Sequence, residues 1–410
     1  YYSAPINAAF GGGASIPIQR QFVGIYNAGV TLPIDISGSI RAAVGQSQFN
    51  EIAARIDVNR VRNTLVFNVR NAFYTALRAQ GTLVVAQETL ANTQARLADA
   101  QATLAAGTGT QFDVLTAQRD VADAQGNLVN ARGSVTVALA QLKNAMGIDV
   151  STPLTIVDSG AVEDPAGEAS TAIEQSPNED LHSVKDQVPL GEEYRTAVDE
   201  AIRTRPEILE GNAAISAARR GVTFARRSQL PSLAVSANYN VQPNFAGFTP
   251  ANQGSIGLTF SVPIFDGGVA RARVRQAEAA VAQAELDRRT SIDAVTLEVQ
   301  QAYVNEVQAR ERVRVANVAV QQAREAFRLA RLRAQAGVSA GPQQSPQIEL
   351  SNAQVSLTQA ETNRVNALYD YNVARSALQR ATGRYSYGGD GGFAQPPTEK
   401  ETGTATPTQP

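Results

Sequence analysis

Few side chains in this sequence could carry out catalysis. The chain has no Cys and a single His, His182, which lies in an acidic stretch that contains prolines. Thiol nucleophiles, disulfides and Cys-based zinc sites are therefore excluded, and His182 fits a solvated loop better than a Ser-His-Asp triad. The Gly-rich segment AFGGGASIP, 9–17, lacks the Gly-Lys-Ser/Thr of a phosphate-binding loop and is predicted to be a plain loop. We predict no enzyme activity, no cofactor and no metal site.

Two acidic residues stand at corresponding places in the chain, each shortly after a turn that contains glycine. They are Asp113 and Glu349, and a helix would put Thr116 and Asn352, three residues on, on nearly the same faces. One interpretation is that these carboxylates are functional and attract cations. The other is a first-turn acid that stabilises the helix that follows it. The sequence leaves both open.

The correspondence arises because the chain contains an internal repeat. VTLPIDISGSIRAAV, 30–44, returns as FSVPIFDGGVARARV, 260–274, so that Pro33 and Pro263 are 230 residues apart. After the second turn the offset becomes 236, because about six residues, 341–346, are inserted. We predict two structural repeats, each with strands, a long helix, a turn and a returning helix.

The helical runs are too long for an ordinary globular core. They are predicted at about 36–106, 112–146, 266–336 and 347–382, and a run of seventy residues would be a rod of about 105 Å. Apolar residues recur every seven places in the first returning run, as in a coiled coil with Ala at one of the two core positions. Long helices with such seams are expected to bury one another. The core positions are Val114, Ala117, Val121, Ala124, Leu128, Ala131, Val135, Ala138 and Leu142.

Four strands of about ten residues are predicted, at Tyr2 to Phe10, 26–34, 232–241 and 256–264. Apolar and small polar residues alternate in them, a pattern typical of membrane-spanning β-strands and also of a half-buried soluble sheet. In lipid an open sheet edge is forbidden, and barrels need about eight strands or more. One chain is therefore too small to close a barrel, whereas three copies supply twelve strands. Pro33 and Pro263 are expected at the strand–helix junctions, where no ladder N–H is needed.

The chain resembles the outer membrane efflux protein family, the TolC-like channel-tunnels. The resemblance covers roughly residues 1–384 and rests on the doubled Pro-Ile junction, the doubled Gly turn with Asp-Val-Leu-x-Ala-Gln at 113–118, and the helix pair at 190–233. It implies a homotrimer with a twelve-stranded β-barrel in the outer membrane of a diderm bacterium and an α-helical barrel in the periplasm. It also implies a periplasmic adaptor and an inner-membrane transporter as partners, and passive conduction of solutes. A non-transporting coiled-coil scaffold is the alternative.

The resemblance also implies roles for the two helix-reversing turns, which would form the periplasmic entrance and contact the adaptor. A plain helix-reversing turn is the other interpretation. In a trimer, the acids near the turns would form a ring of carboxylates around the threefold axis, which would favour cations in the pore. Family members often carry a second acid where this chain has Asn352, so this ring would be weaker here. The residues expected to contact the adaptor are Leu104, Gly107, Thr108, Gly337 and Val338.

The predicted fold is mainly α with a small antiparallel β part, and the net charge of -2 gives no support for nucleic-acid binding. The family has a helix pair before its first hairpin that this chain lacks, so we expect the natural protein to be longer. The predicted divisions are a first repeat at 1–160 (β-hairpin 1–35, helical hairpin 36–147), an acidic equatorial linker at 161–191, a second repeat at 192–384 (helices 192–229, β-hairpin 232–265, helical hairpin 266–383) and a disordered tail at 385–410.

Overall fold

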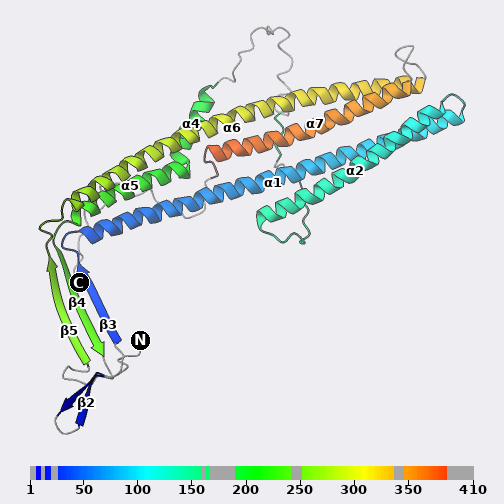
Figure 1. Ribbon diagram of the computed structural model, residues 1–410. Coiled ribbons are helices and arrows are strands. Elements are labelled where there is room, and N and C mark those ends of the chain that lie inside the picture. The colour runs from blue at the N-terminus through cyan, green and yellow to red at the C-terminus, as the bar shows by residue number, and fades with distance from the viewer. Residues whose placement is uncertain are drawn as a thin grey trace, which may run out of the picture. The chain divides into compact units, whose positions relative to one another are not determined.

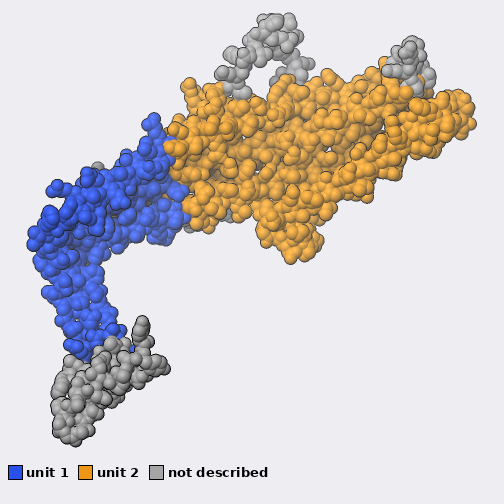
Figure 2. All heavy atoms as spheres, viewed as in Figure 1, with its two compact units in different colours: residues 1–55, 210–289 blue, residues 56–209, 290–410 orange. Residues whose placement is uncertain are grey.

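The computed structural model describes residues 26–157, 162–165, 190–241, 252–336 and 346–385, together with the backbone of two strands at 6–10 and 14–19. The chain divides into two compact units, residues 1–55 with 210–289 and residues 56–209 with 290–410 (Figure 2). The first unit contains the strands, and the second consists mostly of helices. The expectation of a mainly helical protein with a small antiparallel β part is confirmed.

The main sheet of the first unit has three antiparallel strands in the order β3 (Tyr26–Ile34), β4 (Ser232–Val241) and β5 (Asn252–Ser261) (Figure 1). β3 from the first repeat thus pairs with β4 from the second, with Pro33 opposite Ala234. Pro33 is the penultimate residue of β3, and Pro263 follows the last residue of β5 by two places. Every residue of β3 and β5 is exposed, on both faces of the sheet.

The N-terminal part differs from the predicted β-hairpin 1–35. β1 (Ile6–Phe10) pairs with β2 (Ala14–Gln19) in a separate two-stranded sheet, and β2 includes the last four residues of the segment predicted to be a loop at 9–17. Adjacent segments pair at a lower cost in loop-closure entropy than distant ones, which favours this local hairpin. The prediction overlooked the strand because the glycines before it dominated the pattern.

The doubled Pro-Ile junction performs the same local task in both repeats. Asp35 accepts two hydrogen bonds of 3.0 Å from backbone N–H groups at the start of the first long helix. Asp266 accepts bonds of 2.9 and 2.6 Å from N–H groups at the start of its counterpart. Gly38 and Gly268 both have positive φ angles, +72° and +90°, which glycine adopts without steric cost. Each junction therefore ends a strand and caps a helix within a few residues.

The four long helices lie within three residues of their predicted bounds: α1 (Ser39–Ala105), α2 (Gln111–Met146), α6 (Val269–Ala336) and α7 (Pro346–Ala381). In the second unit α2 returns along α1, and α7 returns along α6 (Figure 1). The buried residues of α2 all belong to the predicted seven-residue pattern, which confirms the coiled-coil interpretation. They are Val114, Ala117, Ala124, Leu128, Ala131, Ala138 and Leu142. None of the helices in the described part of the chain has a stretch long and apolar enough to cross a membrane.

Two shorter helices, α4 (Glu192–Thr204) and α5 (Pro206–Arg227), meet at Arg205 in the second unit. The Arg205 side chain is buried and donates a hydrogen bond of 2.7 Å to Glu298 of α6, while Arg380 of α7 donates one of 2.6 Å to the other oxygen of Glu298. Arg205 also reaches the carbonyl of Ala381 at the end of α7. This group of charges joins α6 and α7 to the α4–α5 junction.

The charge network shifts the titration of Glu298. Burial acts to raise the pKa of the Glu298 carboxyl, but the positive charges and hydrogen bonds of Arg205 and Arg380 outweigh it, so the pKa is lowered from the ordinary 4.5. A carboxyl whose pKa is lower in the folded state contributes stability that is complete above its unfolded pKa. That contribution is lost as the pH falls through the folded value.

We predict that Glu298→Gln changes how the protein responds to acid. At about pH 7 the variant should be less stable by about 1–3 kcal/mol, because a charged hydrogen-bond partner is lost. Below about pH 4.5 the difference should shrink, because the unfolded chain protonates Glu298 first and the folded protein does so only at a lower pH. Thermal unfolding followed by circular dichroism at several pH values measures this, with Glu88→Gln at an exposed position of α1 as the control. A difference that stays constant across the pH range would contradict the assignment.

Candidate functional site at the helix-hairpin turns

The first helix-reversing turn lies between α1 and α2 and is closed by backbone hydrogen bonds. Gly107 has a φ of +75°, and its N–H donates to the carbonyl of Leu104 at 3.0 Å. The N–H of Thr108 donates to the carbonyl of Thr103, also at 3.0 Å. Gly107 and Thr108 are exposed, whereas Leu104 packs partly buried against the α1–α2 core. The turn therefore presents backbone and a small polar side chain to its surroundings.

Asp113 belongs to the cap of the helix that follows this turn. The Asp113 N–H donates to Thr110 Oγ1 at 3.2 Å, and Asp113 Oδ2 accepts from the Thr110 N–H at 3.1 Å and from the Thr110 hydroxyl at 2.6 Å. This reciprocal arrangement is a capping box, which satisfies two N–H groups that a helix start otherwise leaves unpaired. Of the two interpretations of Asp113, the helix-stabilising one describes its role within the single chain.

The second turn connects α6 to α7, and Gly337 and Val338, predicted to contact the adaptor, lie outside the described residues. Glu349 in the first turn of α7 accepts a hydrogen bond of 2.5 Å from Arg333 near the end of α6. Its Oε2 atom is buried and has no hydrogen-bond partner among the residues that the structure describes. The charge of Glu349 is therefore balanced mainly by its own hairpin.

The predicted companions of the two acids occupy different environments. Thr116 is half-buried, whereas Asn352 is exposed and its carbonyl accepts a hydrogen bond from the Ser356 hydroxyl. Asp113 and Glu349 thus both have partners within their own hairpins. Asn352, by contrast, is exposed on α7.

A polar cluster near the turns was not predicted from the sequence. Asp120 of α2 forms an ion pair with Arg96 of α1 at 2.9 Å, and their side chains are only 12% and 9% exposed. The hydroxyl of Ser351 of α7 donates to the same carboxylate at 2.8 Å. The cluster joins both helical hairpins. Asp120 directly precedes Val121, one of the predicted core positions, and coiled coils often place pairing charges next to such positions, so the sequence carried part of the signal.

The Asp120 cluster stays ionised under ordinary conditions. Burial acts to raise the pKa of the Asp120 carboxyl, but hydrogen bonds from Arg119, Ser351 and Arg96 outweigh this effect and lower it. The Nε atom of Arg96 is buried without a hydrogen-bond partner in the described part of the chain. A buried pair of this kind contributes little net stability compared with an apolar pair, but losing one member is costly. The cluster therefore favours one spacing of α1, α2 and α7.

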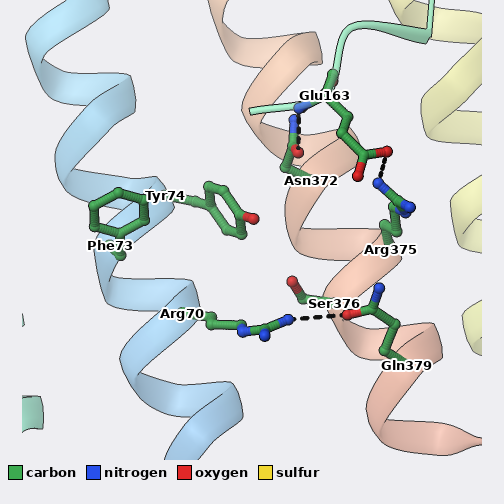
Figure 3. Close-up of a pocket in the computed structure, with 8 residues that line it drawn as sticks. All are labelled: Arg70, Phe73, Tyr74, Glu163, Asn372, Arg375, Ser376 and Gln379. Atoms are coloured by element: carbon green, nitrogen blue, oxygen red, sulfur yellow. Dashed lines mark hydrogen bonds and ion pairs between the residues drawn. The ribbon is translucent and has the colours of Figure 1, made fainter. Parts of the chain in front are cut away.

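A pocket of about 360 Å³ in the second unit lies between α1 and α7 (Figure 3). The four described residues of the acidic linker, 162–165, run along one side of it. Asn372 accepts a hydrogen bond from the Glu163 N–H at 3.0 Å and donates to the Glu163 carbonyl at 3.1 Å, and Arg375 pairs with the Glu163 carboxylate. On the opposite wall Arg70 donates to Gln379 at 3.0 Å (Figure 3). Both arginines thus have protein partners, and Glu163 is attached to α7 through Asn372 and Arg375.

The family model for outer membrane efflux proteins matches residues 11–148 and 197–384, which include both repeats and most of the chain. The chain belongs to the outer membrane efflux protein family. The predicted resemblance is thereby confirmed. A curated relative is the outer membrane efflux protein BepC of Brucella suis biovar 1, which is 28% identical over 187 residues, 45% of this chain and 40% of BepC. The match therefore spans less than half of BepC.

Solved structures show the same fold at low sequence identity. CusC is 18% identical with a TM-score of 0.68, over 93% of this chain and 81% of CusC. The open state of the Neisseria gonorrhoeae MtrE outer membrane channel is 17% identical with a TM-score of 0.64, over 93% of this chain and 80% of MtrE. VceC of Vibrio cholerae is 18% identical with a TM-score of 0.62, over 88% of this chain and 86% of VceC. At these identities the likeness establishes the fold alone.

We predict that Asp120→Leu loosens the hairpins near their turns, because Arg96 would remain buried without its partner. The free energy needed to open the α1–α2 contact should fall by about 3 kcal/mol. Amide hydrogen exchange in this region should therefore become roughly 100-fold faster. The double variant Arg96→Met/Asp120→Leu should recover most of this loss. Hydrogen exchange over residues 93–121 measures it, with Asp123→Leu, at an exposed position of the same helix, as the control. Equally fast exchange in the single and double variants would rule out the ion pair as the cause.

Proposed function

We propose that this protein is the outer-membrane duct of an efflux or secretion system and conducts solutes passively from the periplasm to the exterior. The observation that carries the proposal is the exposed sheet of the first unit. Ile256, Leu258 and Phe260 of β5 form an apolar row that is 61–85% exposed, and Gly257, Thr259 and Ser261 form a small polar row on the other face. Strands of about ten residues with this alternation suit a lipid-facing and a lumen-facing surface.

The same sheet supports assembly from several chains. Within the described residues, β3 and β5 each have one edge without a partner strand. Exposed backbone groups at such edges are not tolerated in lipid, so the edges must be paired by other copies. Three copies with four strands each would give a closed barrel of twelve strands, and we propose that in the assembly the N-terminal segment around β1, which pairs with β2 in the single chain, supplies the fourth strand. The working form is accordingly a homotrimer in the outer membrane of a diderm bacterium.

In the trimer, α1, α2, α6 and α7 would form the periplasmic tube. The chain would work with a periplasmic adaptor and, through it, with an inner-membrane transporter that supplies the energy. The turns would form the entrance and contact the adaptor through Leu104, Gly107, Thr108, Gly337 and Val338. The exposed backbone at Gly107 and Thr108 supports this role, because a turn without bulky side chains lets a partner helix approach closely.

We propose that the acids near the turns tune selectivity in addition to their local structural roles. Three copies of Asp113 and Glu349 around an axis would favour cations, with Thr116 and Asn352 as neutral neighbours. Arg333 lies beside Glu349 and weakens the negative field at that level. A modest cation preference is therefore expected.

We predict that Leu258→Arg abolishes channel formation whereas Thr259→Arg, one residue away on the polar row, preserves it. An arginine that faces lipid costs about 2–4 kcal/mol per copy at the bilayer centre, while a lumen-facing one remains hydrated. Single-channel conductance in planar bilayers distinguishes the two variants. If wild-type protein forms no channels and dissolves without detergent, the duct proposal fails and a scaffold becomes the better account.

We predict that Asp113→Asn combined with Glu349→Gln lowers the cation preference, because two carboxylates per chain are removed from the entrance. Reversal potentials in asymmetric KCl measure the preference. Asp99→Asn, an exposed acid in the last turns of α1, is the control that changes charge near the same turn. Unchanged selectivity in the double variant, or an equal change in the control, would assign the two acids to helix capping and hairpin pairing only.

A further inference from the structure

A groove of about 470 Å³ lies in the first unit, where the chain leaves the sheet and α6 begins. Gln229, Arg271, Val274 and Arg275 line it. Gln229 follows the end of α5, and its side-chain amide lies 3.4 Å from the carbonyls of Ala225 and Ala270, to both of which it donates. Gln229 thus ties the start of α6 to the end of α5, so the groove is a fixed feature of the junction.

The arginines of this junction fall into two groups. Two arginines of α5 have acidic partners on α6: Arg226 lies 2.7 Å from Glu278, and Arg219 lies 3.1 Å from Glu285. The arginines in the first turns of α6 are different.

The side chains of Arg271, Arg273 and Arg275 form no ion pair or hydrogen bond with any residue in the described ranges, and all three are exposed. The nearby acid Asp266 exerts an electrostatic attraction on Arg271, but its carboxylate oxygens already accept the hydrogen bonds that cap α6. Two guanidinium groups therefore line the groove with their donors unused.

Strongly exposed apolar residues precede these arginines in the sequence. Ile264 is 95% exposed and Phe265 is 91% exposed, and both lie between the end of β5 and the start of α6. Arg271 follows Phe265 by six residues. Side chains of this kind suit hydrocarbon, while a guanidinium fits the oxygens of a phosphate with paired hydrogen bonds. The order of residues matches the passage from the interior of a bilayer to its phosphate layer.

We propose that the groove binds the phosphate headgroup of an anionic phospholipid. Arg271 and Arg275 contact the phosphate oxygens, the side-chain oxygen of Gln229 accepts from a headgroup hydroxyl, and Val274 contacts the apolar part next to the phosphate. The proposal rests on the proposed function, because only a sheet that crosses the membrane brings the start of α6 to the bilayer surface. It goes beyond that function by giving the channel a defined lipid site. Charge complementarity selects an anionic lipid over a zwitterionic one.

Native mass spectrometry of the detergent-extracted protein, with added phosphatidylglycerol or phosphatidylethanolamine, tests the site. The expected result is preferential binding of phosphatidylglycerol, weakened about tenfold in Arg271→Gln/Arg275→Gln. Arg273→Gln is the matched control, because Arg273 has the same charge and exposure on the same helix but does not line the groove. Arg273→Gln should weaken phosphatidylglycerol binding by only a small fraction of the tenfold loss expected for the double variant.

Four results would overturn the proposal. Equal phosphatidylglycerol binding in the double variant and the wild type, in protein that still conducts, removes the lipid site but leaves the duct intact. Complete competition by millimolar inorganic phosphate identifies a site for free anions instead. Loss of the trimer in the double variant shows that a second copy of the chain occupies the groove. If wild-type protein forms no channels at all, the proposed function fails first and the lipid site fails with it.

Discussion

The need to pair backbone hydrogen-bonding groups in a solvent that offers none is the constraint on which the proposed architecture depends. β3, β4 and β5 satisfy one another along two ladders, and the outer edges of β3 and β5 have no partner strand within the described residues. Water can satisfy such edges, but lipid is unable to do so. The exposed apolar row on β5 makes water the poorer environment for this sheet. A closed wall built from several copies meets both requirements.

The long helices must be held in one register along one another. Their seams are built largely of Ala and Val, which allow close approach but provide little shape to fix one register. Buried charges supply that information. Asp120 holds Arg96 and Ser351 at one level of the hairpins, and Glu298 holds Arg205 and Arg380 at another. A shift of one helix along another would leave these charges without partners, which costs several kcal/mol for the buried Arg96–Asp120 pair.

Local patterns in the sequence predicted local structure well. The seven-residue pattern from Val114 to Leu142 predicted the buried face of α2, and the predicted bounds of the four long helices lie within three residues of the observed ones. The pairing of β1 with β2, and of Glu349 with Arg333, depends on which segments become neighbours in space, and periodicity carries no such information. The Asp120 cluster could have been anticipated in part, because its charges flank heptad positions, but the contribution of Ser351 from the other repeat could not.

The mass of the protein extracted from outer membranes in mild detergent tests the central claim most directly. The account predicts that native mass spectrometry finds a single assembly of about three times the 43.4 kDa chain, and no stable single chain outside detergent. A monomer that remains folded and dispersed in plain buffer would contradict it, because such a molecule would show that the open edges of the sheet need no partner.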